Sequence, residues 1–479
     1  MYGLGTVVPR LLNYSILTFY YTRLFSVREF GVITELYAYV AFLLVLLTYG
    51  METGYFRFAQ REKSDSVYSS ILSSVFTTSL LFVVIIFILR YRIADILEYS
   101  GNVQYITMLA AIVAIDAFCA IPFARLRKEE RSVKFSALKI INVLVTIVCV
   151  VMFYVVLPRI IEKYPIGMFM KLRSDVTYVL LSNLIASFIT LLLLVPEIFK
   201  TNYKFNWNIL KEVLLYSLPL LIAGLGGTVN ETMDRVLLKQ FIPGKSEALY
   251  ALGIYGANYK IATLLVIFIQ MFRFAAEPFY FNYYGNKDQK MVFGQIMRLF
   301  IMVVIVLMMI IMLYLHYIKY FIASKFHEGL IIVPIVIMSY FFYGIFLNLS
   351  IWYKLTKRTL FGAVITLIGA AITILINVIY IPVYSYMASA AAHFIAYFVM
   401  MVVTFIIGQR YFAIDYKVKR TMEYILVSIA IFAFGYYVLD KSVVADIIKG
   451  MLIVSYGIYG LMREKLISVK RILYAGKNS

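Results

Sequence analysis

Long apolar runs recur along the whole chain, separated by short polar or basic loops. Each run has about 17 to 25 residues, which is enough for a helix to cross a hydrocarbon core of about 30 Å. The runs lack the roughly ten-residue alternation of a membrane barrel, and an open sheet would leave backbone groups unsatisfied in lipid. The sequence therefore predicts an all-α integral membrane protein.

These runs predict about fourteen transmembrane helices. They are placed at residues 3–22, 32–54, 67–89, 105–124, 135–157, 176–199, 214–238, 250–278, 293–315, 330–352, 361–382, 386–408, 423–439 and 444–461. The first run has no basic segment before it, so we interpret it as a span and not as a removable signal peptide. The abrupt start at Met1 suggests that the natural chain begins earlier.

Composition supports the membrane class. Of the 479 residues, 63% are hydrophobic and 15% are charged, whereas soluble proteins have about 45–50% and about 25%. The two cysteines, Cys119 and Cys149, both lie in apolar runs, which excludes a disulfide framework. The three histidines are far apart in the sequence, so no histidine metal cluster is expected.

The net charge of +20 indicates orientation and not a nucleic-acid partner. Lys and Arg favour the loops after even-numbered spans and the C-terminal tail by about two to one, which predicts that both termini are cytoplasmic. This count assigns Lys139 and Arg298 to the loops on the cytoplasmic side and Lys239 to an external loop, and it leaves five cations at membrane depth. They are Arg10, Arg235, Lys260, Arg273 and Lys449.

Short patterns repeat at an offset of about 221 residues. Gly3-Leu-Gly5 corresponds to Gly224-Leu-Gly226, and the segment at 52–57 corresponds to the one at 277–282. A glycine precedes each of these two acidic segments, Gly31 in the first half and Gly253 in the second. Spans one and seven both run outward, so the repeat is parallel, as in alternating-access transporters. We predict two six-helix lobes, at 1–200 and 201–412, and two additional helices with a basic tail at 413–479.

Ionisable groups within the spans indicate function, because each costs several kcal/mol unless it meets a partner or a cavity. Glu231 and Arg235 are four residues apart and can pair on one helical face, as can Arg273 and Glu277. Structural ion pairing is an equally good interpretation of these residues. Asp116 has no cation partner nearby in the sequence and is either a packing group or a cavity group.

Arg10 and Lys260 have no acid within one turn of their own helices. They are the best candidates for an unpaired cationic cavity. Such a cavity favours an anion, because arginine binds phosphate oxygens bidentately and lysine acts as a point charge. A pyrophosphate-linked sugar would use several of these groups at once.

Ordered motifs over nearly the whole chain resemble a known family. They are Gly3–Asn13, Tyr21–Ser26, Glu29–Gly31, Gly50–Arg57, Ile121–Arg127, Gly253–Lys260 and Ala276–Phe281. This set is similar to polysaccharide transporters of the multidrug/oligosaccharidyl-lipid/polysaccharide exporter superfamily. The resemblance implies a flippase that moves undecaprenyl-pyrophosphate-linked oligosaccharide across the bacterial cytoplasmic (inner) membrane for O-antigen, lipopolysaccharide, capsule or exopolysaccharide assembly.

The resemblance also implies site residues. The family's cationic cavity maps onto Arg10, Lys260, Arg235 and Arg273. A sodium site of the related lipid II flippases, built from spans seven, eleven and twelve, matches Asp234 and Asn377 in position, with Thr373 one turn before Asn377. Together with Glu231 and Asp116, these residues are the candidates for coupling to Na⁺ or H⁺ or for ion pairing. Expected partners are the lipid-linked substrate, membrane lipids and polysaccharide polymerase machinery.

Other functions remain open. A lipid II flippase and a multidrug or cation antiporter would share the fold. A membrane O-antigen polymerase would need catalytic groups in a large external loop, and the longest predicted one has about eighteen residues without an obvious acid–base pair. No Gly-x4-Gly-Lys-Ser/Thr motif is present, so we expect no ATP site and no bound cofactor, and a transporter in place of an enzyme.

Overall fold

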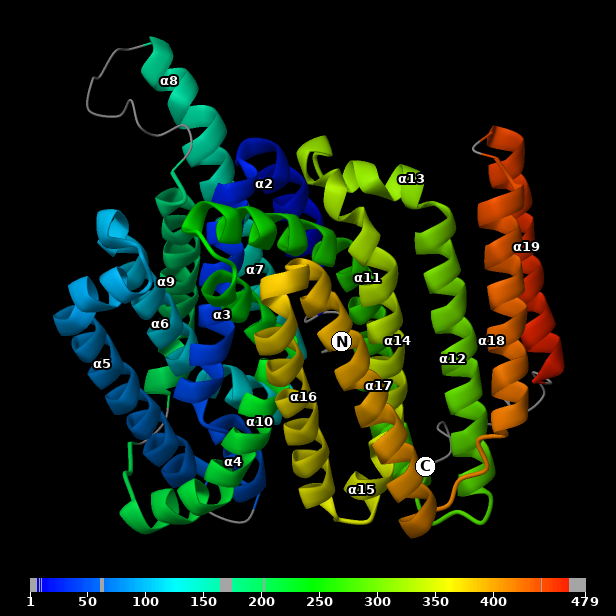
Figure 1. Cartoon of the computed structure of the whole chain (residues 1–479). Coiled ribbons are helices and arrows are strands. Elements are labelled where there is room, and N and C mark those ends of the chain that lie inside the picture. Colours follow the sequence, from blue (N-terminus) through cyan, green and yellow to red (C-terminus); the bar gives the residue numbers. More distant parts are fainter. Residues whose placement is uncertain are drawn as a thin grey trace. The chain divides into compact units, whose positions relative to one another are not determined.

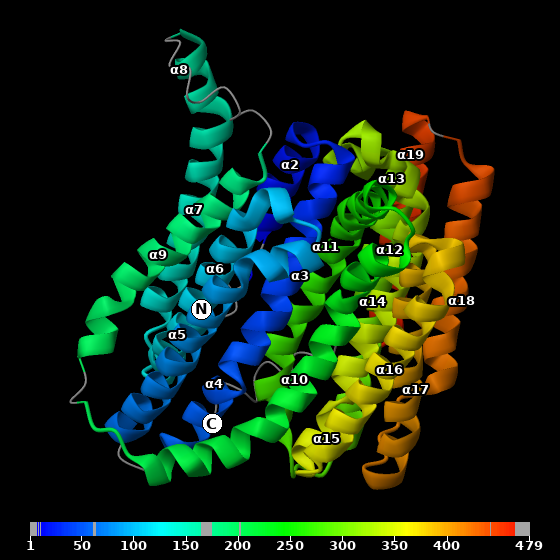
Figure 2. The ribbon, with the colours of Figure 1, turned by 60° about the vertical axis from the view of Figure 1, so that its left-hand side comes forward.

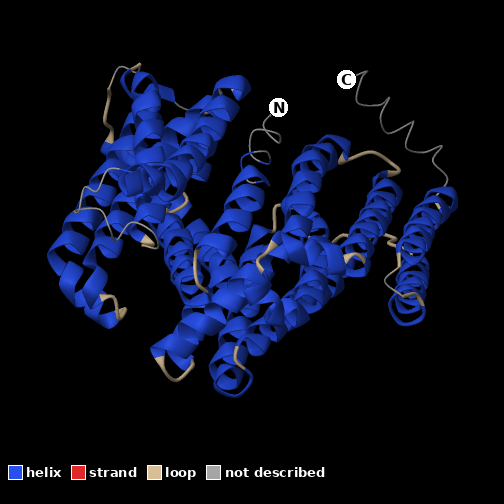
Figure 3. Ribbon diagram, turned by 90° about the horizontal axis from the view of Figure 1, so that it is seen from above, coloured by secondary structure: helices blue, strands red, loops and turns tan. Residues whose placement is uncertain are grey.

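The structure is a computed structural model that describes Val7, Pro9 and residues 11–60, 64–163, 175–200, 203–440 and 442–464. Within these ranges every regular element is a helix (Figure 3). The long α-helices and their short continuations are α2 Thr18–Leu24, α3 Val27–Thr48, α4 Met51–Phe58, α5 Ser64–Ile96, α6 Val103–Lys128, α7 Ser132–Val151, α8 Leu157–Lys163, α9 Thr177–Phe199, α10 Trp207–Phe241, α11 Lys245–Tyr283, α12 Gln289–Leu313, α13 Leu315–Ile318, α14 Ile332–Leu349, α15 Ile351–Leu355, α16 Thr359–Tyr384, α17 Tyr386–Tyr411, α18 Val418–Ala433 and α19 Val443–Arg463 (Figure 1).

Thirteen segments of the described chain are long and apolar enough to cross a membrane. This confirms the predicted fold class. The predicted first span begins at residue 3, which lies outside the described residues, but its later part is helical in η1 Asn13–Leu17 and α2. Several helices exceed their predicted bounds, most clearly α5, α10 and α11, because the helix continues beyond the apolar run into polar turns.

The described chain forms two compact units. Unit 1 comprises residues 1–257 and 366–392, and unit 2 comprises residues 258–365 and 393–479. These units are defined by internal packing and do not test the predicted lobes, so the boundaries at residues 200 and 412 stay predictions. The two units are described separately below.

Unit 1 contains α3 to α10, the first part of α11 and most of α16. Ser26 starts α3 with a capping box, in which its side chain accepts from the Glu29 amide and Glu29 accepts from the Ser26 amide. One core forms where α4, α5, α6 and α10 meet, around Met51, Tyr55, Ile71 and Val213. Helix α10 contains a proline and changes direction along its length (Figure 2).

Unit 2 contains the rest of α11, the helices α12 to α15, the first residues of α16, most of α17, and α18 and α19. A buried ion pair attaches α19 to α12, because Arg298 donates to both oxygens of Glu464 at 2.9 and 3.0 Å. Burial would raise the pKa of Glu464, but hydrogen bonds from Arg298 and Tyr424 hold this pKa below its ordinary value. Lys449, predicted at membrane depth, is buried in α19 and pairs with Asp446 at 3.1 Å.

Candidate functional site

A polar network lies inside unit 1, between α10, α16 and α17. Asn230 donates to the carbonyl of Thr366 at 3.0 Å and accepts from the Thr373 hydroxyl at 3.1 Å. One turn further along α16, Asn377 donates to the carbonyl of Thr373 and accepts from Ser389, both at 2.7 Å. The side chains of this network are almost fully buried. The structure thus joins the predicted residues Thr373 and Asn377, both of span eleven, to Asn230 of span seven and Ser389 of span twelve, which the sequence did not single out.

Asp234 lies one turn after Asn230 on α10 and is fully buried. Its Oδ1 is 3.1 Å from a guanidinium nitrogen of Arg235, and its Oδ2 accepts a hydrogen bond from the hydroxyl of Tyr255. A buried carboxylate needs a counter-charge, and the neighbouring arginine of the same helix provides one. Oxygen ligands suit a hard cation such as Na⁺, so Asp234 and the network of Asn230, Thr373 and Asn377 could hold one.

Arg235 contacts Glu231 through the Glu231 main chain and not through the side-chain ion pair that their spacing suggested. Its guanidinium donates to the main-chain carbonyl of Glu231 and to the carboxylate of Asp234, and the Glu231 side chain is exposed. The guanidinium also lies 5.9 Å from the centre of the Tyr255 ring. Its position is therefore set by Asp234 and Tyr255, two residues that the helical spacing of charges alone did not connect to it.

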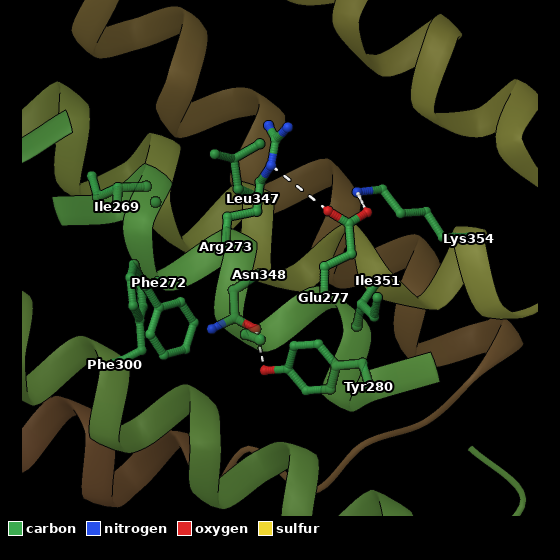
Figure 4. A pocket seen from close by; sticks show the side chains of 12 residues that line it. Ile269, Phe272, Arg273, Glu277, Tyr280, Phe300, Leu347, Asn348, Ile351 and Lys354 are labelled. Atoms are coloured by element: carbon green, nitrogen blue, oxygen red, sulfur yellow. Dashed lines mark hydrogen bonds and ion pairs between the residues drawn. The ribbon is translucent and has the colours of Figure 1, made fainter. Parts of the chain in front are cut away.

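A small pocket of about 20 Å³ lies inside unit 2, between α11, α12, α14 and α15 (Figure 4). Glu277 stands between two cations, with Arg273 Nε at 3.7 Å and Lys354 Nζ at 2.7 Å. The hydroxyl of Tyr280 donates to Asn348 Oδ1 at 2.6 Å on the same wall. The predicted pairing of Arg273 with Glu277 is present, and Lys354 joins it from α15. Two cations against one acid leave this pocket with a net positive charge.

Unit 1 contains a similar arrangement at the equivalent positions of the repeat. Glu52, which corresponds to Glu277, forms an ion pair with Arg127 at the end of α6. Tyr55 is buried three residues after Glu52, as Tyr280 is after Glu277. In both halves an acid at the end of the second span is thus neutralised by a cation from the end of the fourth. This supports the parallel repeat.

Asp116, another predicted residue, lies near a cation. Asp116 forms a hydrogen bond with Ser187 and is attracted by Lys139, a cation that the loop count had placed outside the membrane. Lys139 lies within α7, which begins at Ser132, so the cation near Asp116 comes from another helix, although no cation is near Asp116 in the sequence.

Two predicted cavity residues remain, Lys260 and Arg10. Lys260 is half-buried in α11. Arg10 lies outside the described residues, so its part in a cavity stays a prediction.

Sequence reasoning missed the buried acid Glu35. Glu35 lies in α3, is fully buried and pairs with Lys239 of α10 at 2.9 Å. Lys239 had been assigned to an external loop, but it lies inside α10 and only 7% of its side chain is exposed. A carboxylate within an apolar run was the available signal for Glu35. The lysine could not be paired with it, because the two residues are far apart in the sequence.

Solved structures share this fold. A lipid II flippase, MurJ, in an inward closed conformation matches with a TM-score of 0.73 and 14% identity, over 98% of this chain and 99% of that one. An inward-facing multidrug resistance MATE family transporter of the MOP superfamily matches with a TM-score of 0.66 and 13% identity, over 88% of this chain and 96% of that one. At these identities the similarity concerns the fold.

Sequence comparison identifies the family. No curated protein sequence matches the chain. A family model described as "polysaccharide biosynthesis protein" matches residues 1–280 of the 479. That stretch includes Glu52, Arg127 and Glu277, the polar residues of α10 and most of α11. The chain is thus a multi-pass membrane protein that shares the fold of these two solved structures, and it belongs to the polysaccharide biosynthesis protein family.

Proposed function

We propose that this protein is a flippase for undecaprenyl-pyrophosphate-linked oligosaccharide in the bacterial cytoplasmic membrane. It would move the lipid from the cytoplasmic to the external leaflet for O-antigen, capsule or exopolysaccharide assembly, with both termini in the cytoplasm and polymerase machinery acting on the product. The family's role in polysaccharide biosynthesis and the fold shared with a lipid II flippase support this assignment.

The observation that carries the proposal is the positive pocket of unit 2. Arg273 and Lys354 converge on a single acid, Glu277, and leave one positive charge uncompensated. A phosphate oxygen can replace the Glu277 carboxylate as the acceptor for either cation. Asn348 lines the same pocket, and its amide nitrogen has no hydrogen-bond partner among the described residues. A diphosphate headgroup would supply acceptors for all three groups.

The proposed mechanism is alternating access. The headgroup enters a cavity that is open to the cytoplasm and binds cations that include Arg10, Lys260, Arg235 and Arg273. The polyprenyl chain stays in lipid, because burying its hydrocarbon in a polar cavity would expose apolar surface to water. Rocking of the two lobes then presents the headgroup to the outside, as in other parallel-repeat transporters.

A cation gradient would drive the cycle, with Na⁺ or H⁺ as the coupling ion at Asp234. In this structure the counter-charge of Asp234 is Arg235. A phosphate that draws the Arg235 guanidinium away would leave Asp234 without that charge, and a cation would then restore it. Asn377 and Thr373 would provide further oxygens nearby. Binding of the anion and of the cation would thus favour each other.

The test is flipping by the purified protein in lipid vesicles. A fluorescent undecaprenyl-pyrophosphate oligosaccharide should move between leaflets at a rate that Arg273→Gln reduces, whereas Lys287→Gln, an exposed cation outside the pocket, should leave the rate unchanged. Failure of the parent protein to move this lipid would contradict the proposal.

Lipid II is the second candidate substrate, because the MurJ fold covers nearly the whole chain. It would be assayed in the same vesicles. Transport of lipid II without transport of the oligosaccharide lipid would assign the protein to peptidoglycan synthesis. Export of cationic drugs alone would assign it to multidrug transport.

A further inference from the structure

Two glycines that the sequence repeat paired, Gly31 and Gly253, meet in space inside unit 1. A Cβ atom added to Gly31 would overlap the carbonyl oxygen of Leu249 on α11, and one added to Gly253 would overlap the carbonyl oxygen of Val27 on α3. The backbones of α3 and α11 are therefore in direct contact. Main-chain atoms cannot rotate away as a side chain can, so neither position accepts a larger residue without separating the helices.

A third close approach extends this crossing by one turn. A Cβ on Gly256 would lie 3.1 Å from the Cβ of Thr34. The contact thus runs from Val27 to Thr34 on α3 and from Leu249 to Gly256 on α11. Both stretches lie in the first turns of their helices, next to ends that the charge pattern predicts to be external.

A buried ion pair lies next to the crossing. Glu35 Oε1 accepts from Lys239 Nζ and from the Tyr39 hydroxyl, both at 2.9 Å, while Oε2 accepts from the Tyr99 hydroxyl at 2.5 Å. The ammonium group of Lys239 also donates to the carbonyl of Leu97 at 2.6 Å and lies 4.1 Å from the centre of the Tyr99 ring. The pair therefore ties α10 to α3 and to the end of α5.

Exposed side chains at the predicted external ends of α3 and α11 add weaker contacts. Lys245, at the start of α11, donates to the carbonyl of Glu98 after α5. Arg28 donates to the carbonyl of Ser246 at 3.4 Å and is 3.9 Å from Glu247. These side chains are exposed, so they contribute little to stability. The main contacts of α3 with α10 and α11 are therefore the backbone contact at Gly31 and Gly253 and the buried ion pair of Glu35 with Lys239.

From these contacts we infer that Gly31, Glu35, Tyr99, Lys239 and Gly253 form an outer clasp, which closes the external side of the transport path and must open in every cycle. The inference rests on the proposed alternating-access function. The clasp joins α3 and α5 of the first predicted lobe to α10 and α11 of the second. Rocking of the lobes to the outward-open state therefore cannot occur while these contacts persist.

The physical character of the clasp suits a reversible closure. The glycine contact is made by main-chain atoms and by the short side chains of Val27 and Thr34, so no long side chain has to be withdrawn when the helices separate. The ion pair is the costly part to break, because it is buried and both of its groups have further hydrogen bonds. When the clasp opens, water can solvate both charges, which lowers that cost.

The first test measures opening without any substrate. In a protein whose Cys119 and Cys149 are replaced by serine, Thr34→Cys places one thiol against Gly256, inside the clasp. A membrane-impermeant maleimide added to right-side-out vesicles should label it slowly. Glu35→Gln removes the charge but keeps the size, and Gly253→Ala pushes the helices apart. Each should accelerate labelling by roughly tenfold or more, since tenfold corresponds to about 1.4 kcal/mol.

Matched controls accompany these variants. Glu98→Gln makes the same acid-to-amide change at an exposed position after α5, and Gly227→Ala adds a methyl group to a helical glycine with open space around it. Neither should change the labelling rate. Folded Glu35→Gln and Gly253→Ala proteins that label at the parent rate would overturn the clasp, and so would labelling of Thr34→Cys from the cytoplasmic side alone.

A second test keeps the proposal falsifiable if those variants do not fold. The pair Thr34→Cys and Gly256→Cys should form a disulfide under mild oxidation, because the two Cβ positions are close together. The cross-linked protein should bind the lipid-linked oligosaccharide but not flip it, and a reductant should restore flipping. Flipping at the parent rate by the cross-linked protein would contradict the clasp. If the parent protein flips no lipid, the proposed function fails, while the labelling result still tests the closure.

Discussion

The carboxylate of Glu35 and the ammonium group of Lys239 form an ion pair at 2.9 Å, although 204 residues separate them in the sequence. Neither group is open to water in this conformation, since Glu35 is fully buried and the Lys239 side chain is 7% exposed. Two tyrosine hydroxyls complete the coordination of the carboxylate. The pair is thus a buried charge cluster that connects helices from both halves of the repeat.

Lys239→Met should destabilise the folded protein by about 3–5 kcal/mol, because it leaves the Glu35 charge buried without its counter-ion. Glu35→Gln together with Lys239→Met should cost less than the sum of the two single changes, since the double variant buries no charge. Thermal unfolding of the four proteins in detergent measures this coupling. Additive effects would show that the pair does not act as a unit.

The attachment of α19 to α12 should depend on acid pH. The pKa of Glu464 is lowered in the folded protein, so the ion pair with Arg298 stabilises the fold above the ordinary carboxyl pKa of 4.5. This contribution is lost as the pH falls through the lower, folded-state pKa. The difference in melting temperature between the parent and Glu464→Gln should therefore be constant near neutral pH and shrink below about pH 4. A difference that does not change down to pH 3 would contradict this.

Anion binding should depend on the two cations of the unit 2 pocket. Arg273→Gln and Lys354→Gln should each weaken binding of inorganic pyrophosphate by about tenfold or more, the effect of losing one charge-assisted hydrogen bond. Glu277→Gln should strengthen binding, because it removes the acid that competes with phosphate for both cations. Calorimetric titration measures all three. Weaker binding in Glu277→Gln would mean that the acid orients the cations more than it competes with the anion.

If an anion draws Arg235 away from Asp234 and a cation replaces it, binding of the anion should strengthen binding of the cation. Na⁺ should raise the melting temperature of the parent protein more when pyrophosphate is present than when it is absent, because the anion draws Arg235 from Asp234. Arg235→Gln should respond to Na⁺ without pyrophosphate. In Asp234→Asn the response to Na⁺ should be lost. A parent protein equally stabilised by Na⁺ with and without the anion would exclude this exchange.

Helical membrane architecture could be predicted from the sequence because it depends on local properties. The length and apolar character of each run decide whether a helix can cross lipid, and α9, predicted at 176–199, is found at Thr177–Phe199. Spacing along one helix also predicted the contact between Arg273 and Glu277. The exact ends were less predictable, since a helix such as α11 continues through polar turns that carry no hydropathy signal.

Contacts between different helices could not be predicted from such local properties. Lys239 and Lys139 were counted as loop charges, because hydropathy alone does not show that a neighbouring helix provides an acid. Asp234 is predicted to couple to Na⁺ or H⁺ or to form an ion pair, and the structure shows that its neighbours are Arg235 and Tyr255. Charges within one helix follow a fixed spacing, whereas charges on different helices depend on packing.

The sequence by itself determined that this chain lies in a membrane, that its spans are helical and that Gly31 and Gly253 occupy equivalent places in a repeat. Only the tertiary structure decided that these two glycines meet, and that Glu35 lies against Lys239 beside them. The reason is physical. Insertion into lipid is governed by each segment's own transfer free energy, whereas the pairing of buried charges and the close approach of two backbones are decided by which helices pack together.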